Sequence, residues 1–115
     1  MSNNFKEIIQ SSKPTLVDFY ADWCGPCKMQ APILKEFKNK VGDRVAILKI
    51  DVDKNPAVSQ HYKIRSIPTL MLFKNGQAVW TQSGVASETV LEQVLKSLNK
   101  FLESVLTFHQ IHRNV

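Results

Sequence analysis

The chain has 115 residues, two cysteines, a net charge of +5 and a hydrophobic share of 43%. A chain of this length is expected to form one domain around a single core, and two cysteines exclude a core held by many disulfides. The positive charge raises the question of a nucleic-acid partner, but the lysines are scattered and form no basic run. We therefore expect a mildly basic, solvated surface and no nucleic-acid partner.

The N-terminus and the hydropathy pattern indicate the cellular compartment of the protein. The pattern of a signal peptide, an apolar run behind a basic start, is absent from the first residues. No apolar stretch approaches the roughly 18 residues that a membrane-spanning helix needs. The sequence therefore predicts a cytoplasmic protein without a membrane partner, in a compartment that normally keeps thiols reduced.

The first half of the chain alternates between helical and β-rich patterns. Asn4 with Glu7 fits a capping pair for a short opening helix, and Gly42 stands where a longer helix should stop. A strand, a helix and a second strand in this order predict a βαβ unit with parallel strands and a right-handed crossover. The expected elements are a helix near residues 5–9, a strand over 15–21, a helix over 24–41 and a strand over 45–52.

The second half predicts a hairpin between two helices. Asn55, followed by proline, begins a short helix that reaches Tyr62. Asn75-Gly76 lies between two β-rich runs, over 69–73 and 77–82, and is a strong signal for a hairpin turn. A final helix starts near Ser87. The fold class is therefore α/β, with a central mixed sheet of about four strands flanked by helices on both faces.

Two cysteines separated by Gly-Pro lie where the first strand leads into the second helix, in Trp23-Cys24-Gly25-Pro26-Cys27-Lys28. Disulfide exchange needs a thiolate, and a free cysteine with a pKa of about 8.5 is mostly protonated at neutral pH. Unpaired N–H groups at a helix N-terminus stabilise the thiolate. The two-residue spacer lets the second sulfur reach the first within one turn, and proline suits the first turn of a helix.

Two other interpretations of the pair are weaker. Two small buried core residues would not need Gly-Pro between them at a strand-to-helix junction. A structural zinc site needs four ligands, and only His109 and His112 could complete it, at a spacing shorter than usual and far along the chain. We therefore expect no metal, and we expect His109 and His112 to face solvent.

The sequence closely resembles the thioredoxin family over roughly residues 5 to 100. The resemblance implies the thioredoxin fold and a protein-disulfide reductase that works by dithiol–disulfide exchange. It implies no cofactor besides the Cys24–Cys27 couple, and as partners disulfide-containing proteins and an NADPH-dependent flavoprotein, thioredoxin reductase. The residues that carry the resemblance are Val17-Asp18-Phe19-Tyr20-Ala21, Trp23 to Lys28, Ala31-Pro32-Ile33-Leu34, Asp53 before Asn55-Pro56, Ile67-Pro68-Thr69 and Phe73-Lys74-Asn75-Gly76.

The resemblance also implies catalytic roles. Cys24 attacks the substrate disulfide, and Cys27, deeper in the helix and shielded, resolves the mixed disulfide. Asp18, in an otherwise apolar strand, is the expected proton-transfer group, because burial raises the pKa of a carboxyl group; a solvent-facing strand residue is the alternative. Lys49 matches a buried lysine that modulates Asp18, unless its side chain reaches water.

The same resemblance assigns a substrate-binding surface. Pro68 matches a proline whose preceding bond is cis, which the sequence alone does not decide. A cis bond would leave the backbone of Ile67 free to pair with an extended substrate. The expected apolar rim around Cys24 consists of Trp23, Gly25, Pro26, Ile67, Pro68, Gly84 and Val85.

The sequence departs from the family in three places. The leading edge strand that some members carry is expected to be missing, Ser66 replaces a frequent glycine, and residues 101–115 extend beyond a domain of residues 1–100. The extension is interpreted as an extended C-terminal helix that frays, in a monomer. Alternatively, its apolar residues Phe101, Leu102, Val105 and Phe108 support dimerisation or the docking of a partner.

Two other functions stay open at this point. An oxidant or isomerase of the same fold would run the exchange in the other direction, against which Gly-Pro and a reducing compartment argue. A non-catalytic interaction module would use the C-terminal apolar stripe as its working surface.

Overall fold

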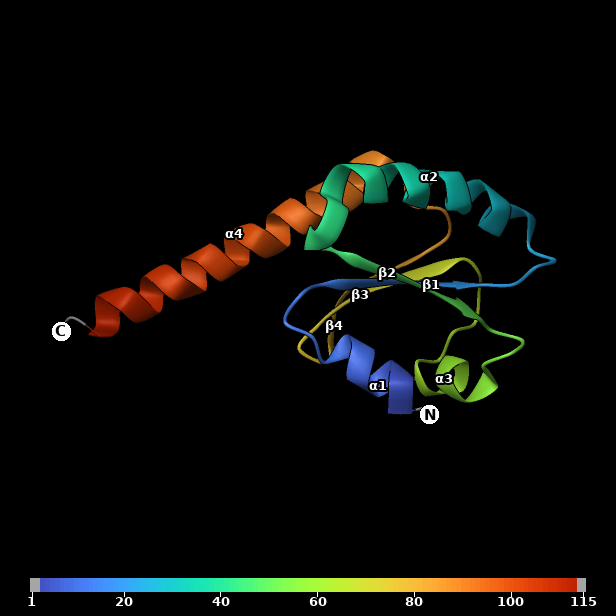
Figure 1. The fold of residues 1–115 in the computed structure, drawn as a ribbon, viewed down its shortest axis with the longest axis horizontal. Coiled ribbons are helices and arrows are strands. Elements are labelled where there is room, and N and C mark those ends of the chain that lie inside the picture. Colours follow the sequence, from blue (N-terminus) through green and yellow to red (C-terminus); the bar gives the residue numbers. More distant parts are fainter. Residues whose placement is uncertain (1–2, 114–115) are drawn as a thin grey trace.

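The computed structural model describes the backbone of residues 3–113 and the side chains of residues 4–100. Its centre is a four-stranded sheet, with α2 and α4 on one face and α1 and α3 on the other (Figure 1). The elements are α1 Asn3–Ile9, β1 Thr15–Tyr20, α2 Gly25–Val41, η1 Gly42–Arg44, β2 Ala46–Asp51, α3 Pro56–His61, β3 Thr69–Lys74, β4 Gln77–Ser83 and α4 Glu88–Arg113.

The strand order β2-β1-β3-β4 confirms the predicted mixed sheet. β1 and β2 run parallel and are joined by α2, which is the expected βαβ unit, while β3 pairs antiparallel with both β1 and β4. Within residues 3–113, β2 has one neighbouring strand and forms an edge of the sheet. The expectation that a leading edge strand is missing therefore agrees with the part of the chain that the structure describes.

Alternation along β1 divides the core into two layers. Leu16 packs on the α2 and α4 face, whereas Val17 and Phe19 pack on the α1 and α3 face. The first layer includes Leu34, Phe37, Val41, Leu70, Leu72, Leu91 and Leu95, and the second includes Phe5, Ile9, Ile50, Val58, Met71 and Phe73. Even-numbered residues of β1 therefore lie beneath the helix that carries the cysteines.

The β3–β4 turn is fixed by its backbone and by α1. Asn75 and Gly76 have φ of 52° and 82°, the left-handed region that a two-residue hairpin turn requires. The Asn75 N–H donates to the Ser11 carbonyl at 3.0 Å, and the Gly76 N–H donates to that of Ile9 at 2.8 Å. The hairpin signal in the sequence is confirmed, and the turn also ties the sheet to the end of α1.

Two predicted helix caps are wrong in detail. α1 begins at Asn3, so Asn4 lies inside the helix and does not cap it. Asn55 does precede α3, but its side chain makes no cap hydrogen bond and its Nδ2 donates to the Asp51 carbonyl at 3.0 Å instead. Such side chains bond whichever backbone group the folded loop brings near, and sequence spacing does not determine that choice.

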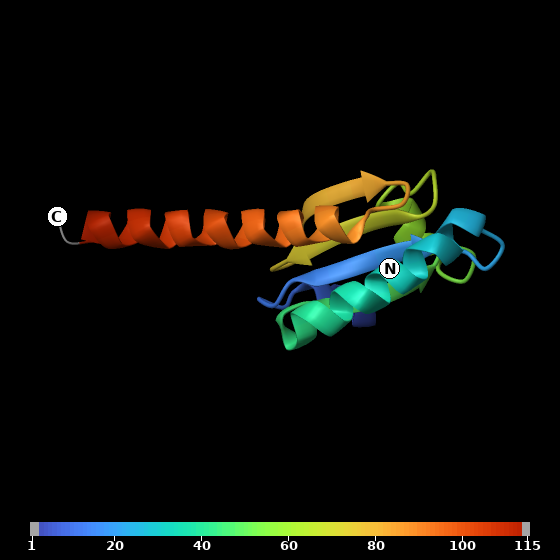
Figure 2. The ribbon, with the colours of Figure 1, turned by 90° about the horizontal axis from the view of Figure 1, so that it is seen from above.

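α4 begins on the core and continues past it. Ser87 Oγ accepts a hydrogen bond from the Val90 N–H at 3.2 Å, and Lys40 on α2 forms ion pairs with Glu88 and Glu92. Beyond the sheet the helix projects away from the body of the molecule (Figures 1 and 2). The side chains of the predicted stripe, from Phe101 to Phe108, lie outside the described residues. Among the described helices, none is both long and apolar enough to cross a membrane.

Candidate active site

Cys24 and Cys27 form a disulfide at the start of α2, with their Cα atoms 5.3 Å apart. Cys24 is the N-cap residue, and the N–H of Cys27 donates to Cys24 Sγ at 3.2 Å. When the pair is reduced, this N–H and the positive end of the helix dipole favour a thiolate on Cys24 over the neutral thiol. The geometry therefore gives Cys24 Sγ a backbone N–H donor at the helix N-terminus.

The two cysteines do not differ in exposure. Cys24 is 4% exposed and Cys27 is 5% exposed. The expectation that Cys27 is shielded is therefore confirmed, and Cys24 is equally buried in the disulfide form, because both side chains pack beside Ala21 and Ile67. The two cysteines differ in their position on the helix. Cys24 is the N-cap residue, and its Sγ accepts a hydrogen bond from a backbone N–H, whereas Cys27 lies within the first turn.

Two segments distant in the sequence meet beside Cys24. The Ile67–Pro68 bond is cis, as the resemblance implied, and the Ile67 carbonyl oxygen lies 3.7 Å from Cys24 Sγ. The N–H of Gly84 donates to the Pro68 carbonyl at 2.8 Å. These contacts join the N-terminus of α2, the segment before β3 and the loop after β4 into one surface.

Most of the predicted rim lies open to solvent. Trp23 is 71% exposed, Gly25, Pro26 and Gly84 are exposed, and Ile67 and Val85 are half-buried. Pro68 is buried, so its ring belongs to the packing beneath the surface and not to the rim itself. The remaining six residues of the predicted set provide an open, largely apolar surface beside the disulfide.

Trp23 has a partner that the sequence did not reveal. Its Nε1–H donates at 2.8 Å to Oδ2 of Asp53, which lies in the loop between β2 and α3. Asp53 belongs to a motif that resembles the family, but no role was predicted for it. A pairing between residues thirty positions apart leaves no local signal in the sequence.

Asp18 is a buried carboxyl group beneath the active-site helix. Its side chain is 1% exposed, and no described donor hydrogen-bonds either oxygen. Burial raises its pKa from 3.8 to about 6, and the positive charge of Lys49 opposes part of this rise. Asp18 shares the α2 face of β1 with Leu16, because residues two apart on a strand face the same way. Its carboxylate can therefore accept a proton near neutral pH.

Lys49 is exposed, and the expectation of a buried lysine is wrong. It pairs across the sheet with Asp18, but β2 is an edge strand and the long side chain reaches solvent. Its ammonium lies 4.6 Å from the centroid of the Tyr20 ring, in the range of a cation–π interaction. The alternative interpretation, a strand lysine that extends to water, is the one the structure supports.

A buried amide on α2 was missed. Gln30 is 0% exposed and makes two hydrogen bonds with the backbone of Ala86, in the loop between β4 and α4. The only signal in the sequence is a polar residue within the buried face of an amphipathic helix, which also carries Leu34 and Phe37.

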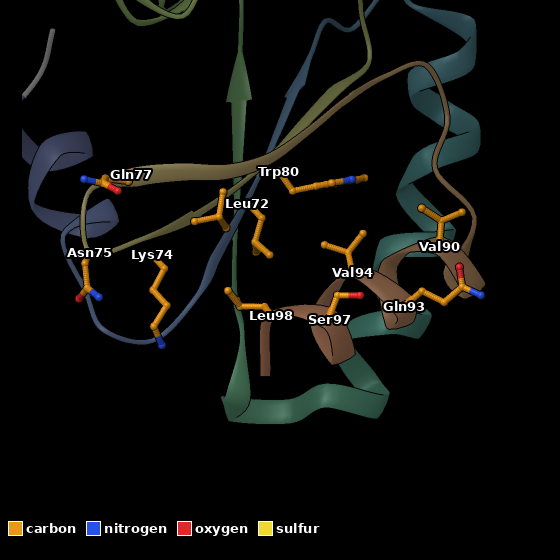
Figure 3. Close-up of a pocket in the computed structure, with 11 residues that line it drawn as sticks. Leu72, Lys74, Asn75, Gln77, Trp80, Val90, Gln93, Val94, Ser97 and Leu98 are labelled. Atoms are coloured by element: carbon orange, nitrogen blue, oxygen red, sulfur yellow. The ribbon is translucent and has the colours of Figure 1, made fainter. Parts of the chain in front are cut away.

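One large groove lies away from the disulfide. A groove of about 830 Å³ runs between the β3–β4 hairpin and α4, and Trp80, Val94 and Leu98 are among the residues that line it (Figure 3). Neither cysteine contributes to it. The described part of the chain contains no cluster of three histidine, cysteine or acidic side chains placed to hold a metal, and His109 and His112 lie outside the described side chains.

Comparison with known proteins identifies the family. The family model described as Thioredoxin matches residues 1–97, which include every candidate site residue. The chain belongs to the thioredoxin family. Among its relatives, Thioredoxin 1 of Synechococcus elongatus is 49% identical over 90 residues, or 78% of this chain and 84% of that protein. The thioredoxin of Rickettsia felis is 46% identical over 94 residues, or 81% and 90% of the two chains.

A solved thioredoxin structure agrees with the sequence comparison. The oxidised form of mitochondrial thioredoxin 3 from Saccharomyces cerevisiae superposes with a TM-score of 0.73 at 36% identity, covering 82% of this chain and 87% of that one. With the Cys24–Cys27 disulfide at the start of α2, this membership makes the chain a thiol-disulfide oxidoreductase that reduces protein disulfides.

Proposed function

We propose that the chain is a general cytoplasmic reductase of protein disulfides, in which Cys24 attacks, Cys27 resolves and Asp18 accepts the resolving proton. The observation that carries the assignment of roles is the hydrogen bond from the Cys27 N–H to Cys24 Sγ at 3.2 Å. This bond supports a thiolate on the sulfur at the helix N-terminus.

The exchange takes two steps that conserve electrons and protons. Cys24 thiolate attacks one sulfur of the substrate disulfide, and the other sulfur leaves as a thiolate. Cys27 thiolate then attacks Cys24 Sγ and breaks the mixed disulfide, which releases the second substrate thiolate. The substrate gains two electrons and two protons, and the protein is left with the Cys24–Cys27 disulfide.

The resolving step needs a base, because Cys27 must lose its proton before it attacks. Asp18 fits this role in its burial, its place beneath α2 and a pKa raised to about 6 by burial. Its carboxylate takes the proton of Cys27, directly or through water. Lys49 modulates Asp18 from the neighbouring strand, since its charge lowers the pKa of the carboxyl group.

The substrate lies across the rim beside Cys24. The Ile67 carbonyl, 3.7 Å from Cys24 Sγ, accepts a backbone hydrogen bond from an extended substrate segment. Trp23, Gly25, Pro26, Gly84 and Val85 provide apolar contacts, and Pro68 supports them from below. A shallow apolar surface of this kind accepts many sequences, which suits a general reductase.

We propose that an NADPH-dependent flavoprotein, thioredoxin reductase, restores the dithiol, and that the chain needs no cofactor besides its cysteines. Working as a reductant places it in the cytoplasm, where it transfers electrons and maintains redox homeostasis. Residues 1–100 form the catalytic domain, and residues 101–115 form a helical extension of a monomer. A dimer through this extension is the alternative.

The midpoint potential of the Cys24–Cys27 couple tests the direction of electron flow. The protein is equilibrated against a dithiol buffer, and Trp23 fluorescence reports its redox state. We expect a value near the thioredoxin family's own reference potential of about −270 mV. A value near about −120 mV, typical of strong oxidants, would instead make the chain an oxidant.

Single-cysteine variants test the roles of the two sulfurs. Cys27→Ser should accumulate a mixed disulfide with a protein substrate, because Cys24 still attacks but nothing resolves the product. Cys24→Ser serves as the matched control and should trap far less. Equal trapping by both variants would contradict the assignment.

A further inference from the structure

Gln30 links the active-site helix to the loop that follows β4. Its Nε2 donates to the Ala86 carbonyl at 3.0 Å, and its Oε1 accepts from the Ala86 N–H at 2.8 Å. Both residues are 0% exposed. A glutamine side chain carries one acceptor and two donors on a single amide, so it can pair with both backbone groups of one residue.

The backbone of Ala86 needs this pairing. Ala86 lies in the loop between Ser83, the last residue of β4, and Glu88, the first residue of α4. Buried backbone groups outside secondary structure must find a side chain or water, and here Gln30 satisfies both. A leucine or methionine would fill the same space without offering a hydrogen bond.

The loop is held at several points. The Gly84 N–H bonds the Pro68 carbonyl at 2.8 Å, and the Val85 carbonyl accepts from Gln82 Nε2 at 3.2 Å. Val85 therefore lies between an anchor on the segment of Pro68 and an anchor on α2. The second anchor moves with the cysteines, because Gln30 follows Cys27 by three residues and so lies on the same side of the helix.

We propose that Gln30 is a positioning residue for protein substrates: it fixes the Gly84–Ala86 loop relative to α2 and thereby sets how an extended substrate lies beside Cys24. This inference rests on the proposed assignment of Gly84 and Val85 to the substrate surface. The two described hydrogen bonds of the Gln30 side chain go to Ala86 and not to a sulfur, so Gln30 affects the binding of a large substrate and leaves the exchange chemistry alone.

The test compares two substrates on the full chain. Gln30→Met keeps the length of the side chain and removes both hydrogen bonds. The reduction of insulin disulfides gives KM and kcat for a protein substrate, and hydroxyethyl disulfide probes the cysteines without engaging the rim. We expect KM for insulin to rise on the order of tenfold, since small misplacements of binding groups have effects of this size. The rate with hydroxyethyl disulfide and kcat for insulin should stay unchanged.

Val41→Ala is the matched control for lost stability. Val41 is buried on the same helix, about three turns beyond Gln30. Its side chain has no donor or acceptor that could hold the loop backbone. It should lower stability and leave KM for insulin unchanged. If Gln30→Met does not fold, Gln30→Asn keeps the amide but is one methylene too short to reach both Ala86 groups. Faster amide hydrogen exchange at Val85 and Ala86 in the folded variant is the accompanying readout.

Three results would overturn the proposal: an unchanged KM in a folded Gln30 variant, an equal rise of KM in Val41→Ala, or an equal loss of rate with both disulfides. The second would mean a general effect of stability, and the third an effect on the cysteines themselves. Failure of the proposed function would look different, because the unsubstituted chain would then not reduce insulin at all, and the inference would fall with it.

Discussion

Replacing Asp18 with asparagine should stabilise the protein at neutral and alkaline pH. The carboxyl group is 1% exposed and accepts no hydrogen bond from any described donor. Burial raises its pKa to about 6 in the folded state, from 3.8 for an aspartate side chain in water. The folded protein therefore binds this proton more tightly than the unfolded chain does. The resulting stability is fully present below pH 3.8 and is lost as the pH rises through about 6.

The magnitude follows from the size of the shift. The difference between about 6 and 3.8 is roughly two pKa units, and each unit corresponds to about 1.4 kcal/mol. Ionisation of Asp18 therefore costs the folded state about 3 kcal/mol at pH 8. Asparagine has nearly the same shape and never ionises. We expect Asp18→Asn to gain about 2–3 kcal/mol at pH 8 and only about 0.5 kcal/mol at pH 4.

Urea unfolding of the oxidised full-length protein, repeated from pH 4 to pH 8, measures this difference. Asp51→Asn is the matched control, because Asp51 is also a buried aspartate, on the adjacent strand. Its Oδ1 accepts the N–H groups of Asp53 at 2.9 Å and Lys54 at 3.3 Å, and asparagine keeps an accepting oxygen for both. Asp51→Asn should therefore gain no stability at pH 8.

The reasoning about Asp18 would be refuted by a variant no more stable than the unsubstituted protein at pH 8. It would equally be refuted by a gain that stays constant down to pH 4, because the effect must disappear once the carboxyl group is protonated. A gain in stability from Asp51→Asn would show that burial alone, without regard to hydrogen bonding, decides the sign of the change in the free energy of unfolding.

Three further outcomes are expected. Gly76→Ala should destabilise the protein by about 1–2 kcal/mol in urea unfolding, because φ is +82° and a Cβ atom would lie 2.6 Å from Gln10 Nε2; a loss below about 0.5 kcal/mol would contradict this. Asp53→Ala removes the hydrogen bond of an exposed Trp23, so it should raise KM for insulin while changing stability by less than about 0.5 kcal/mol; an unchanged KM would remove Trp23 from the substrate surface. A chain ending at Asn99 should keep full reductase activity, and sedimentation should give monomer masses for it and for the full-length protein; a full-length dimer would instead support association through the extension.

Local chemistry explains why the elements could be predicted. The hairpin at Asn75-Gly76 follows from a backbone conformation that few other residues adopt, and the start of α2 follows from proline in its first turn. The role of the cysteine pair follows from thiolate chemistry at a helix N-terminus. Each depends on residues close together in the chain, so the sequence carries the whole signal.

The wrong predictions concern side-chain exposure and a helix boundary, which depend on solvent and on neighbouring elements. Lys49 was expected to be buried, but β2 is an edge strand and its long side chain reaches water. Asn4 was expected to cap α1, but the helix begins one residue earlier. Neither outcome depends on residue type alone, because the exposure of a side chain and the position at which a helix begins depend on what packs against them.

By itself, the sequence determined the α/β class, the order of the elements and the redox pair, since periodicity, turn residues and a two-residue spacer are local properties. Only the tertiary structure decided which polar groups find partners. The hydrogen bonds of Trp23 with Asp53 and of Gln30 with Ala86 join residues 30 and 56 positions apart, whereas the Asp18 carboxyl group has no hydrogen-bond partner within the described part of the chain. Packing of the sheet and helices brings such groups together, and desolvation then fixes the cost of an unpaired charge.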